Sequence, residues 1–180
     1  MTWLRKNWFF LPVILIVAFA VHAGSVALIP RAVMAKALGK MSAAHGFNAI
    51  AHSPRATSAS RAVVRPSPDL LYSACPFDLD ALAGHVLHVH ADRMPNTYWS
   101  FSVFDAETNN IFVLNDRQAK TDKADFAVVG PAQDKVPPGL VVRSPTMRGL
   151  VLVRTLINDE KNFAMIDTAR RTTTCGPFRN

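Results

Sequence analysis

The chain has 180 residues, which is room for one domain plus a leader or an anchor, and 49% of them are hydrophobic while only 18% are charged. The net charge of +7 lies at one end: residues 1–66 hold eight basic and no acidic residues, whereas residues 67–180 hold twelve basic and thirteen acidic ones. A nucleic-acid-binding domain would carry its positive charge on the folded part, so this distribution excludes nucleic acid as the expected partner and favours a lipid bilayer with anionic headgroups.

Residues 1–30 are expected to form a membrane anchor or a signal segment. Trp8–Ile29 contains no Asp, Glu, Lys or Arg over 22 residues, about 33 Å of helix and enough to cross the hydrocarbon core. Two interpretations fit this segment. It is either a single uncleaved transmembrane helix that ends near Pro30, or a signal peptide cleaved after the small-residue site Val21-His22-Ala23.

The orientation of this segment is predicted from the charges and the cysteines together. Arg5 and Lys6 would hold the N-terminus in the cytoplasm, although Arg31, Lys36 and Lys40 flank the other end. A topology that also suits the cysteines exports residues 31–180 across the membrane.

Residues 31–62 are expected to form a basic juxtamembrane region. The stretch RAVMAKALGKMSAA predicts a short helix lying on the membrane surface, with a plain helical spacer as the alternative. The Ser-, Pro- and Ala-rich stretch that follows is typical of a linker or an extended entry strand.

Cys75 and Cys175 are the only cysteines, and no Cys-x-x-Cys motif points to a redox pair or a zinc knuckle. In an oxidising exported compartment two such residues usually pair. We therefore predict a disulfide, with two buried thiols as the alternative.

Residues 63–180 predict an exported all-β sandwich-like domain, because short apolar runs alternate with turn signals about every ten residues. The expected strands are Leu70–Leu79, Val86–Ala91, Tyr98–Asp105, Ile111–Asn115, Ala124–Val129, Leu140–Arg143 and Leu150–Leu156. Pro76 restricts the first strand to a sheet edge or a bulge. One helix is expected at Asp159–Arg171, capped by Asn158.

The stretch TYWSFSVFDAETNNIFVLNDR, residues 97–117, predicts a hairpin in the core. Alternation places Trp99, Phe101 and Val103 on one face, toward the core. Ile111–Leu114 is apolar on both faces, so it predicts a central strand covered on both sides.

Several sequence blocks resemble a family of bacterial proteins, the domain-of-unknown-function family 1254. They are Pro-x-x-Asp-Leu-Leu-Tyr-Ser at 66–73 with Phe-Asp-Leu at 77–79, Tyr-Trp-Ser-Phe-Ser-Val-Phe-Asp at 98–105, Asn-Asp-Arg at 115–117 and Arg-Gly-Leu-Val-Leu-Val-Arg at 148–154. The resemblance covers roughly residues 60–175 and implies a sandwich-like domain. It also implies a partner, an envelope protein that carries the family's sister domain, and it supplies no agreed catalytic residues.

Three histidines and one polar tripeptide are the candidate binding residues. His88 and His90 share a face of their strand while His85 points away, and no acid-rich partner motif stands out, so we expect no metal site. Asn115, Asp116 and Arg117 end the core hairpin, and the arginine offers a planar fork to a carboxylate or phosphate. The alternative for Asp116 and Arg117 is a turn residue and a structural ion pair.

The motifs of common hydrolases, nucleotide-binding proteins and zinc peptidases are absent from the sequence, and we expect no cofactor. The first hypothesis is a binding or accessory module on the periplasmic face of the bacterial inner membrane, held there as a single-pass protein. The second is an envelope hydrolase or ligand-binding enzyme that uses Asp116, Arg117 and His88 or His90.

Overall fold

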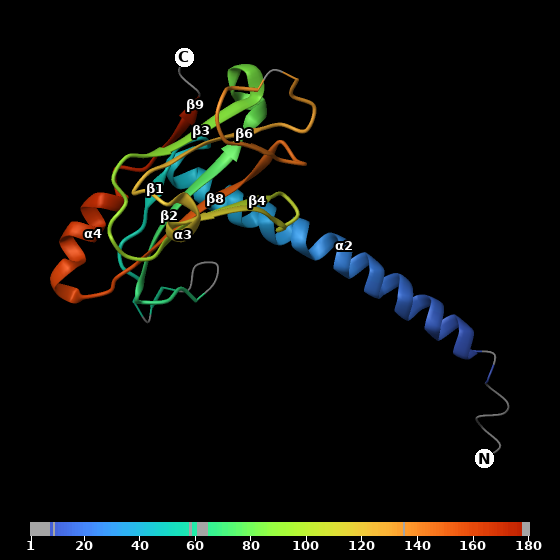
Figure 1. Ribbon diagram of the computed structural model, residues 1–180. Helices are drawn as coiled ribbons and strands as arrows, with labels where there is room; N and C mark the ends of the chain where they lie inside the picture. The colour runs from blue at the N-terminus through green and yellow to red at the C-terminus, as the bar shows by residue number, and fades with distance from the viewer. Residues whose placement is uncertain (1–7, 9, 58, 61–64, 135, 178–180) are drawn as a thin grey trace.

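A long N-terminal helix leads into two β-sheets in the computed structural model (Figure 1). The structure describes residues 8, 10–57, 59–60, 65–134 and 136–177. The helices are α2 (Phe10–His45), α3 (Asp116–Ala119) and α4 (Phe163–Arg170), with short 3₁₀ turns at Leu79–Ala81, Ala83–His85 and Glu160–Asn162. The strands are β1 (Ala51–His52), β2 (Leu70–Asp78), β3 (Val86–Ala91), β4 (Trp99–Asp105), β5 (Asn110–Asn115), β6 (Ala124–Val129), β7 (Val141–Arg143), β8 (Arg148–Leu156) and β9 (Thr174–Pro177).

The two sheets have five and four strands, in the orders β1-β2-β8-β4-β5 and β7-β6-β3-β9. All neighbours are antiparallel except β6 and β7, which run parallel. The prediction of an all-β sandwich-like domain with a C-terminal helix, preceded by an apolar helix, is confirmed. Every predicted strand is present, and the bounds of β3 and β6 agree to the residue.

The core lies between the sheets and is built by alternation along the strands. Trp99, Phe101 and Val103 are fully or almost fully buried, as the sequence predicted. Phe101 packs edge-on against Phe126 of the opposite sheet, with ring centroids 5.8 Å apart, and Phe112 packs against the same ring at 5.2 Å. Rings from both sheets therefore interlock at the centre of the sandwich.

The prediction that Ile111–Leu114 forms a central covered strand is wrong. These residues belong to β5, which is the edge of the five-stranded sheet. Phe112 and Leu114 are half-buried against the core, but Val113 is 40% exposed. A run that is apolar on both faces has the same pattern whether protein or solvent covers its second face, so the sequence cannot separate these cases.

Pro76 lies inside β2, opposite Leu150 of β8. Its carbonyl accepts a hydrogen bond from the backbone N–H of Asn48, so its nitrogen points to the same side, away from β8. Beyond the two-residue strand β1 this side of β2 is a sheet edge, where proline removes no ladder hydrogen bond. β1 itself was not predicted, and it shows that the sandwich begins before residue 63.

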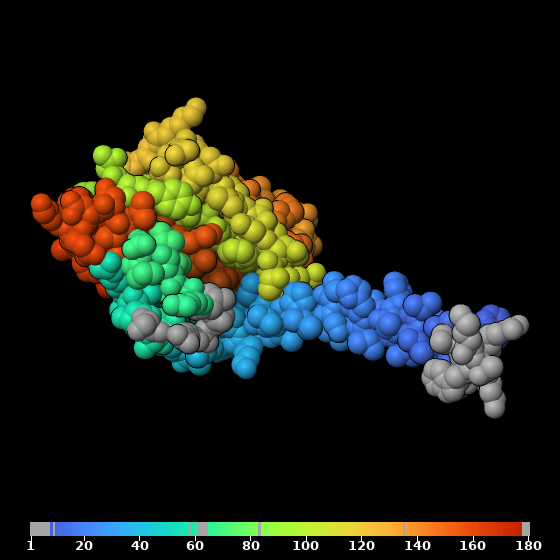
Figure 2. All heavy atoms as spheres, turned by 90° about the horizontal axis from the view of Figure 1, so that it is seen from below, coloured from blue at the N-terminus to red at the C-terminus, as the bar shows by residue number. Residues whose placement is uncertain are grey.

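α2 is one continuous helix rather than an anchor that ends near Pro30 followed by a separate surface helix. Pro30 lies inside it and removes one backbone donor, and the Arg31 guanidinium donates to the neighbouring carbonyl of Ala27 at 2.7 Å. Its C-terminal part packs on β2 and β8, where it buries Met34, Ala37 and Leu38. Figure 2 shows the apolar N-terminal part projecting from the sandwich as a free arm. The charges predicted at Arg5 and Lys6 lie outside the described residues.

The C-terminal helix begins with a 3₁₀ turn that continues into α4. Asp159, and not Asn158, caps the turn: its carboxylate accepts from the backbone N–H of Lys161 at 2.9 Å. At the other end Arg170 is almost completely buried, whereas Arg171 is exposed.

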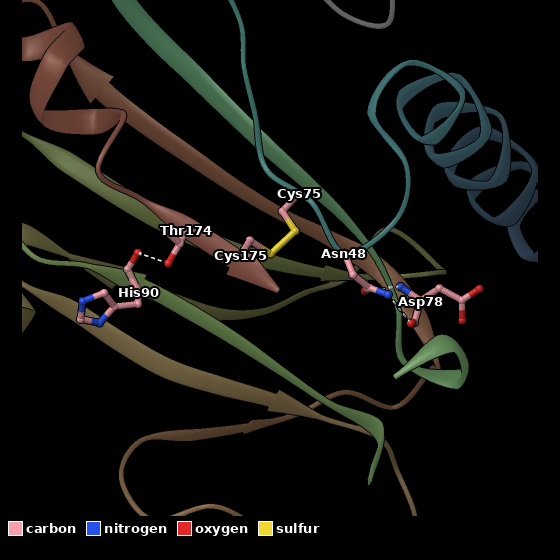
Figure 3. Close-up of a disulfide and its surroundings, with 6 residues drawn as sticks. All are labelled: Asn48, Cys75, Asp78, His90, Thr174 and Cys175. Atoms are coloured by element: carbon pink, nitrogen blue, oxygen red, sulfur yellow. Dashed lines mark hydrogen bonds between the residues drawn. A yellow bond between two sulfur atoms is a disulfide. The ribbon is translucent and has the colours of Figure 1, made fainter. Parts of the chain in front are cut away.

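The predicted disulfide between Cys75 and Cys175 is present and joins β2 to β9 across the two sheets (Figure 3). β9 was not predicted from the sequence. It pairs with β3, with Cys175 opposite Val89 and Thr174 opposite His90. The disulfide therefore fixes the strand that borders the histidine strand.

Candidate functional site

A cluster of imidazole and carboxylate groups lies on the outward face of the four-stranded sheet. In β3, Leu87, Val89 and Ala91 are buried while His88 and His90 alternate with them and point outward. On the neighbouring strand β6, Asp125 lies directly opposite His90 and is the one exposed residue of that strand. Alternation and register thus bring three side chains to one face.

The Asp125 carboxylate bridges the two histidines. Its Oδ1 lies 2.9 Å from His88 Nε2, and its Oδ2 lies 3.0 Å from His90 Nδ1. The other ring nitrogen of His90, Nε2, lies 3.1 Å from a carboxylate oxygen of Asp92. We refer to His88, His90, Asp125 and Asp92 as the histidine–aspartate cluster.

The contacts in the cluster favour a protonated His90 and ionised Asp92 and Asp125. The hydrogen bond to Asp92 raises the pKa of His90, more than offsetting its partial burial. The same bond lowers the pKa of Asp92. Burial works to raise the pKa of Asp125, but the hydrogen bonds with His88 and His90 outweigh it, so that the pKa is lowered. His90 therefore holds its proton more firmly than a free imidazole does.

His85 stays outside the cluster, as alternation predicted. Its Nδ1 lies 2.9 Å from the carbonyl oxygen of Leu79, in the turn before β3. Its backbone φ of 52° places it in the left-handed region, which turns the chain into the strand.

The second predicted set, Asn115, Asp116 and Arg117, lies at the end of β5 in the other sheet. Asn115 Oδ1 accepts from the backbone N–H groups of Arg117 and Gln118, and Gln118 Oε1 accepts from the N–H of Asn115. This is a capping box that starts α3. Arg117 is exposed and Asp116 is half-buried, and the carboxylate that meets both histidines is that of Asp125.

Sequence reasoning found both histidines but missed Asp125 and Asp92. Both strands, β3 and β6, were predicted with the correct bounds, and Asp125 is the sole charged residue of Ala124–Val129. Nothing in the sequence specified that these two strands are neighbours or gave their register. The lone acid in an apolar strand was the available signal.

The sequence profile of a family described as protein of unknown function, DUF1254, matches residues 47–177. The chain belongs to this family. The resemblance noted from the sequence blocks is confirmed, and the match begins just after α2, so that it includes β1. We call the matched region the DUF1254 domain.

Two solved structures are similar to this chain, and the first of them shares its fold. The VPA0106 protein from Vibrio parahaemolyticus matches with a TM-score of 0.62 at 15% identity, over 84% of this chain and 37% of its own. A putative uncharacterized protein from Burkholderia cenocepacia gives a TM-score of 0.46 at 17% identity, over 86% of this chain and 41% of its own. The chain therefore spans less than half of either neighbour. No curated protein matches the sequence.

Proposed function

We propose that this protein is a membrane-tethered binding module. In this proposal it holds its DUF1254 domain on the periplasmic side of the bacterial inner membrane and presents it to an envelope protein that carries the family's sister domain. The observation that best supports this proposal is the structure of α2. One unbroken helix is long and apolar enough to cross a membrane and then packs its last turns on the sandwich.

The junction between helix and sandwich supports a rigid tether. Besides the buried residues of α2, Arg31 forms an ion pair with Glu107 in the β4–β5 turn. Arg148 at the start of β8 lies over the Phe47 ring, 5.6 Å from its centroid, and also bonds to Asp78. These contacts follow directly after the apolar segment, so the sandwich would be held at the membrane surface in a defined orientation.

The edge strand β5 is the surface we assign to the partner. An edge strand directs alternate backbone N–H and C=O groups away from its sheet, where they can pair with another strand. Exposed Val113 and the half-buried Ile111 add apolar area beside those groups. The proposed ligand of β5 is an extended strand of the partner protein. Such a strand would pair with the outward backbone groups of β5 and cover its apolar side chains at the same time. The VPA0106 protein also supports a partner domain. The match covers 37% of that chain, so the shared fold is accompanied there by further polypeptide.

Site-specific photo-cross-linking in intact cells tests the surface. A photoreactive residue at Val113 is expected to capture one envelope protein, whereas the same residue at Met165, which is exposed on α4, is the matched control. Capture of the same proteins from both positions, or none from Val113, would refute the edge-strand surface.

The orientation is tested separately. Alkaline phosphatase fused after residue 177 is expected to be active, and green fluorescent protein at the same position dark. The reverse pattern would place the domain in the cytoplasm and contradict the tether as proposed.

A further inference from the structure

We propose that His88, His90 and Asp125 bind one divalent transition-metal ion of the Zn²⁺ and Cu²⁺ class on the outward face of the four-stranded sheet. The ligand atoms are Nε2 of His88, Nδ1 of His90 and the carboxylate of Asp125. This site is separate from the edge strand β5, so the inference does not rest on the proposed function.

The geometry suits a single ion. One ligand atom from each of the three residues can be chosen so that all lie within 4.8 Å of one another. An ion bound at about 2.0–2.1 Å holds adjacent ligands about 3.0–3.4 Å apart. At present Asp125 Oδ1 lies 2.9 Å from His88 Nε2 and Oδ2 lies 3.0 Å from His90 Nδ1, so both rings already direct a nitrogen at the carboxylate, and the ion would replace these two contacts.

Asp92 supplies the second reason to read the cluster as a metal site. A histidine that binds metal through one ring nitrogen usually donates the N–H of the other to a carboxylate, which fixes the tautomer and the ring orientation. His90 has this arrangement, with Nδ1 toward Asp125 and Nε2 3.1 Å from Asp92. The neutral tautomer with its proton on Nε2 leaves Nδ1 as the ligand.

The backbone under the site is firmly held. β3 pairs with β6 on one side and β9 on the other, and the disulfide at Cys175 ties β9 to the other sheet. Figure 3 shows His90 and Thr174 on adjacent strands beside that disulfide. Two ligands two residues apart on one strand and a third on its neighbour are thus presented without rearranging the main chain.

The donor set selects the class of ion. Two imidazole nitrogens and one carboxylate suit Zn²⁺, Ni²⁺ and Cu²⁺, with Cu²⁺ bound most tightly, whereas Ca²⁺ and Mg²⁺ prefer oxygen ligands alone. Both cysteines are in the disulfide, so no thiolate contributes. The histidine side chains are 29% and 30% exposed, which leaves water access to the remaining coordination positions.

The test uses the full chain purified in detergent without a polyhistidine tag. Zn²⁺ is titrated by calorimetry and in competition with a chromophoric chelator. The wild type is expected to bind one ion per chain, and His90→Ala and Asp125→Asn are expected to weaken binding more than Asp92→Asn, which should lose about 10–100-fold. His45→Ala, at the exposed end of α2, is the matched control and should bind like the wild type.

X-ray absorption of the Zn²⁺-loaded wild type gives a readout that needs no variant. Two imidazoles per zinc would support the site. No saturable Zn²⁺ binding by the wild type, fewer than two imidazoles per zinc, or His90→Ala and Asp125→Asn variants that fold normally by circular dichroism and bind like the wild type would each overturn it.

Discussion

At the scale of single residues, the buried Arg170 links the C-terminal helix to the five-stranded sheet. Its guanidinium donates to the carbonyl of Tyr72 at 2.8 Å, to Ser73 Oγ at 3.0 Å and to the carbonyl of Ser53 at 2.7 Å, and it also pairs with Asp167. Arg170→Ala is expected to lower the free energy of unfolding by about 3 kcal/mol, because it leaves buried acceptors without a donor. Urea unfolding followed by circular dichroism measures the loss.

Arg171 is the matched control for Arg170. It pairs with the same carboxylate of Asp167, but its side chain is 51% exposed. Arg171→Ala should therefore cost less than about 1 kcal/mol. Equal losses at both positions would show that Arg170 does not make the buried contacts described.

His52 adds a pH dependence to the same network. Burial lowers its pKa, and the nearby positive charges of Arg170 and Arg171 lower it further. The folded state thus binds this proton less readily than the unfolded state, whose pKa is about 6.5. As the pH falls from 7 through 6.5 and below, the free energy of unfolding of the wild type should therefore decrease relative to that of His52→Gln.

The measurement for His52 is urea unfolding of both proteins between pH 5 and pH 8. The difference between wild type and variant isolates His52 from His90, whose raised pKa acts in the opposite sense, adding stability at low pH that is lost as the pH rises. Parallel stability curves for wild type and His52→Gln would contradict the lowered pKa.

At the scale of secondary-structure elements, Gly149 allows β8 to lie between β2 and β4. A Cβ at this position would lie 2.2 Å from the carbonyl oxygen of Phe104 and 2.4 Å from the Phe77 ring. Gly149→Ala is expected to destabilise the protein by about 3 kcal/mol or more, because the backbone of β4 cannot move away without breaking its ladder. The melting temperature by circular dichroism measures the effect.

Gly39 is the glycine control. It lies in α2, and a Cβ there would meet nothing within 4 Å. Gly39→Ala should leave the stability unchanged or raise it by up to about 1 kcal/mol, since alanine favours helix. A Gly149→Ala variant as stable as Gly39→Ala would rule out the described packing of β8.

At the scale of the whole molecule, the disulfide closes a loop with a sequence separation of 100. Chain-entropy arguments give a stabilisation of about 4.7 kcal/mol for a loop of this length. Reduction, or the double substitution Cys75→Ala with Cys175→Ala, should lower the free energy of unfolding by a similar amount. Two reactive thiols in the denatured, non-reduced protein would exclude the bond.

Truncation tests how the helix and the sandwich depend on each other. Removing residues 1–30 leaves Met34, Ala37 and Leu38 on the sheet, and this variant is expected to be soluble and as stable as the wild type. Removing residues 1–45 uncovers the surface that these side chains bury and should cost about 3 kcal/mol. Equal melting temperatures for the two truncations would show that the end of α2 contributes nothing to the domain.

The sequence by itself determined the features that depend on local pattern. The uncharged run from Trp8 to Ile29 identified the apolar helix, and alternation identified the strands and the core side of Trp99, Phe101 and Val103. The two cysteines were sufficient to predict their pairing, because the domain was expected to be exported and two cysteines in an oxidising compartment usually pair.

Only the tertiary structure decided which strands are neighbours. It placed β5 at an edge, joined Asp125 to His88 and His90, and buried Arg170 against the backbone of β2. These outcomes depend on pairings between segments far apart in the chain, and the local pattern of a strand is the same whatever lies beside it. The functional proposals for the edge strand and the histidine–aspartate cluster therefore both come from strand order and register, which no local pattern specifies.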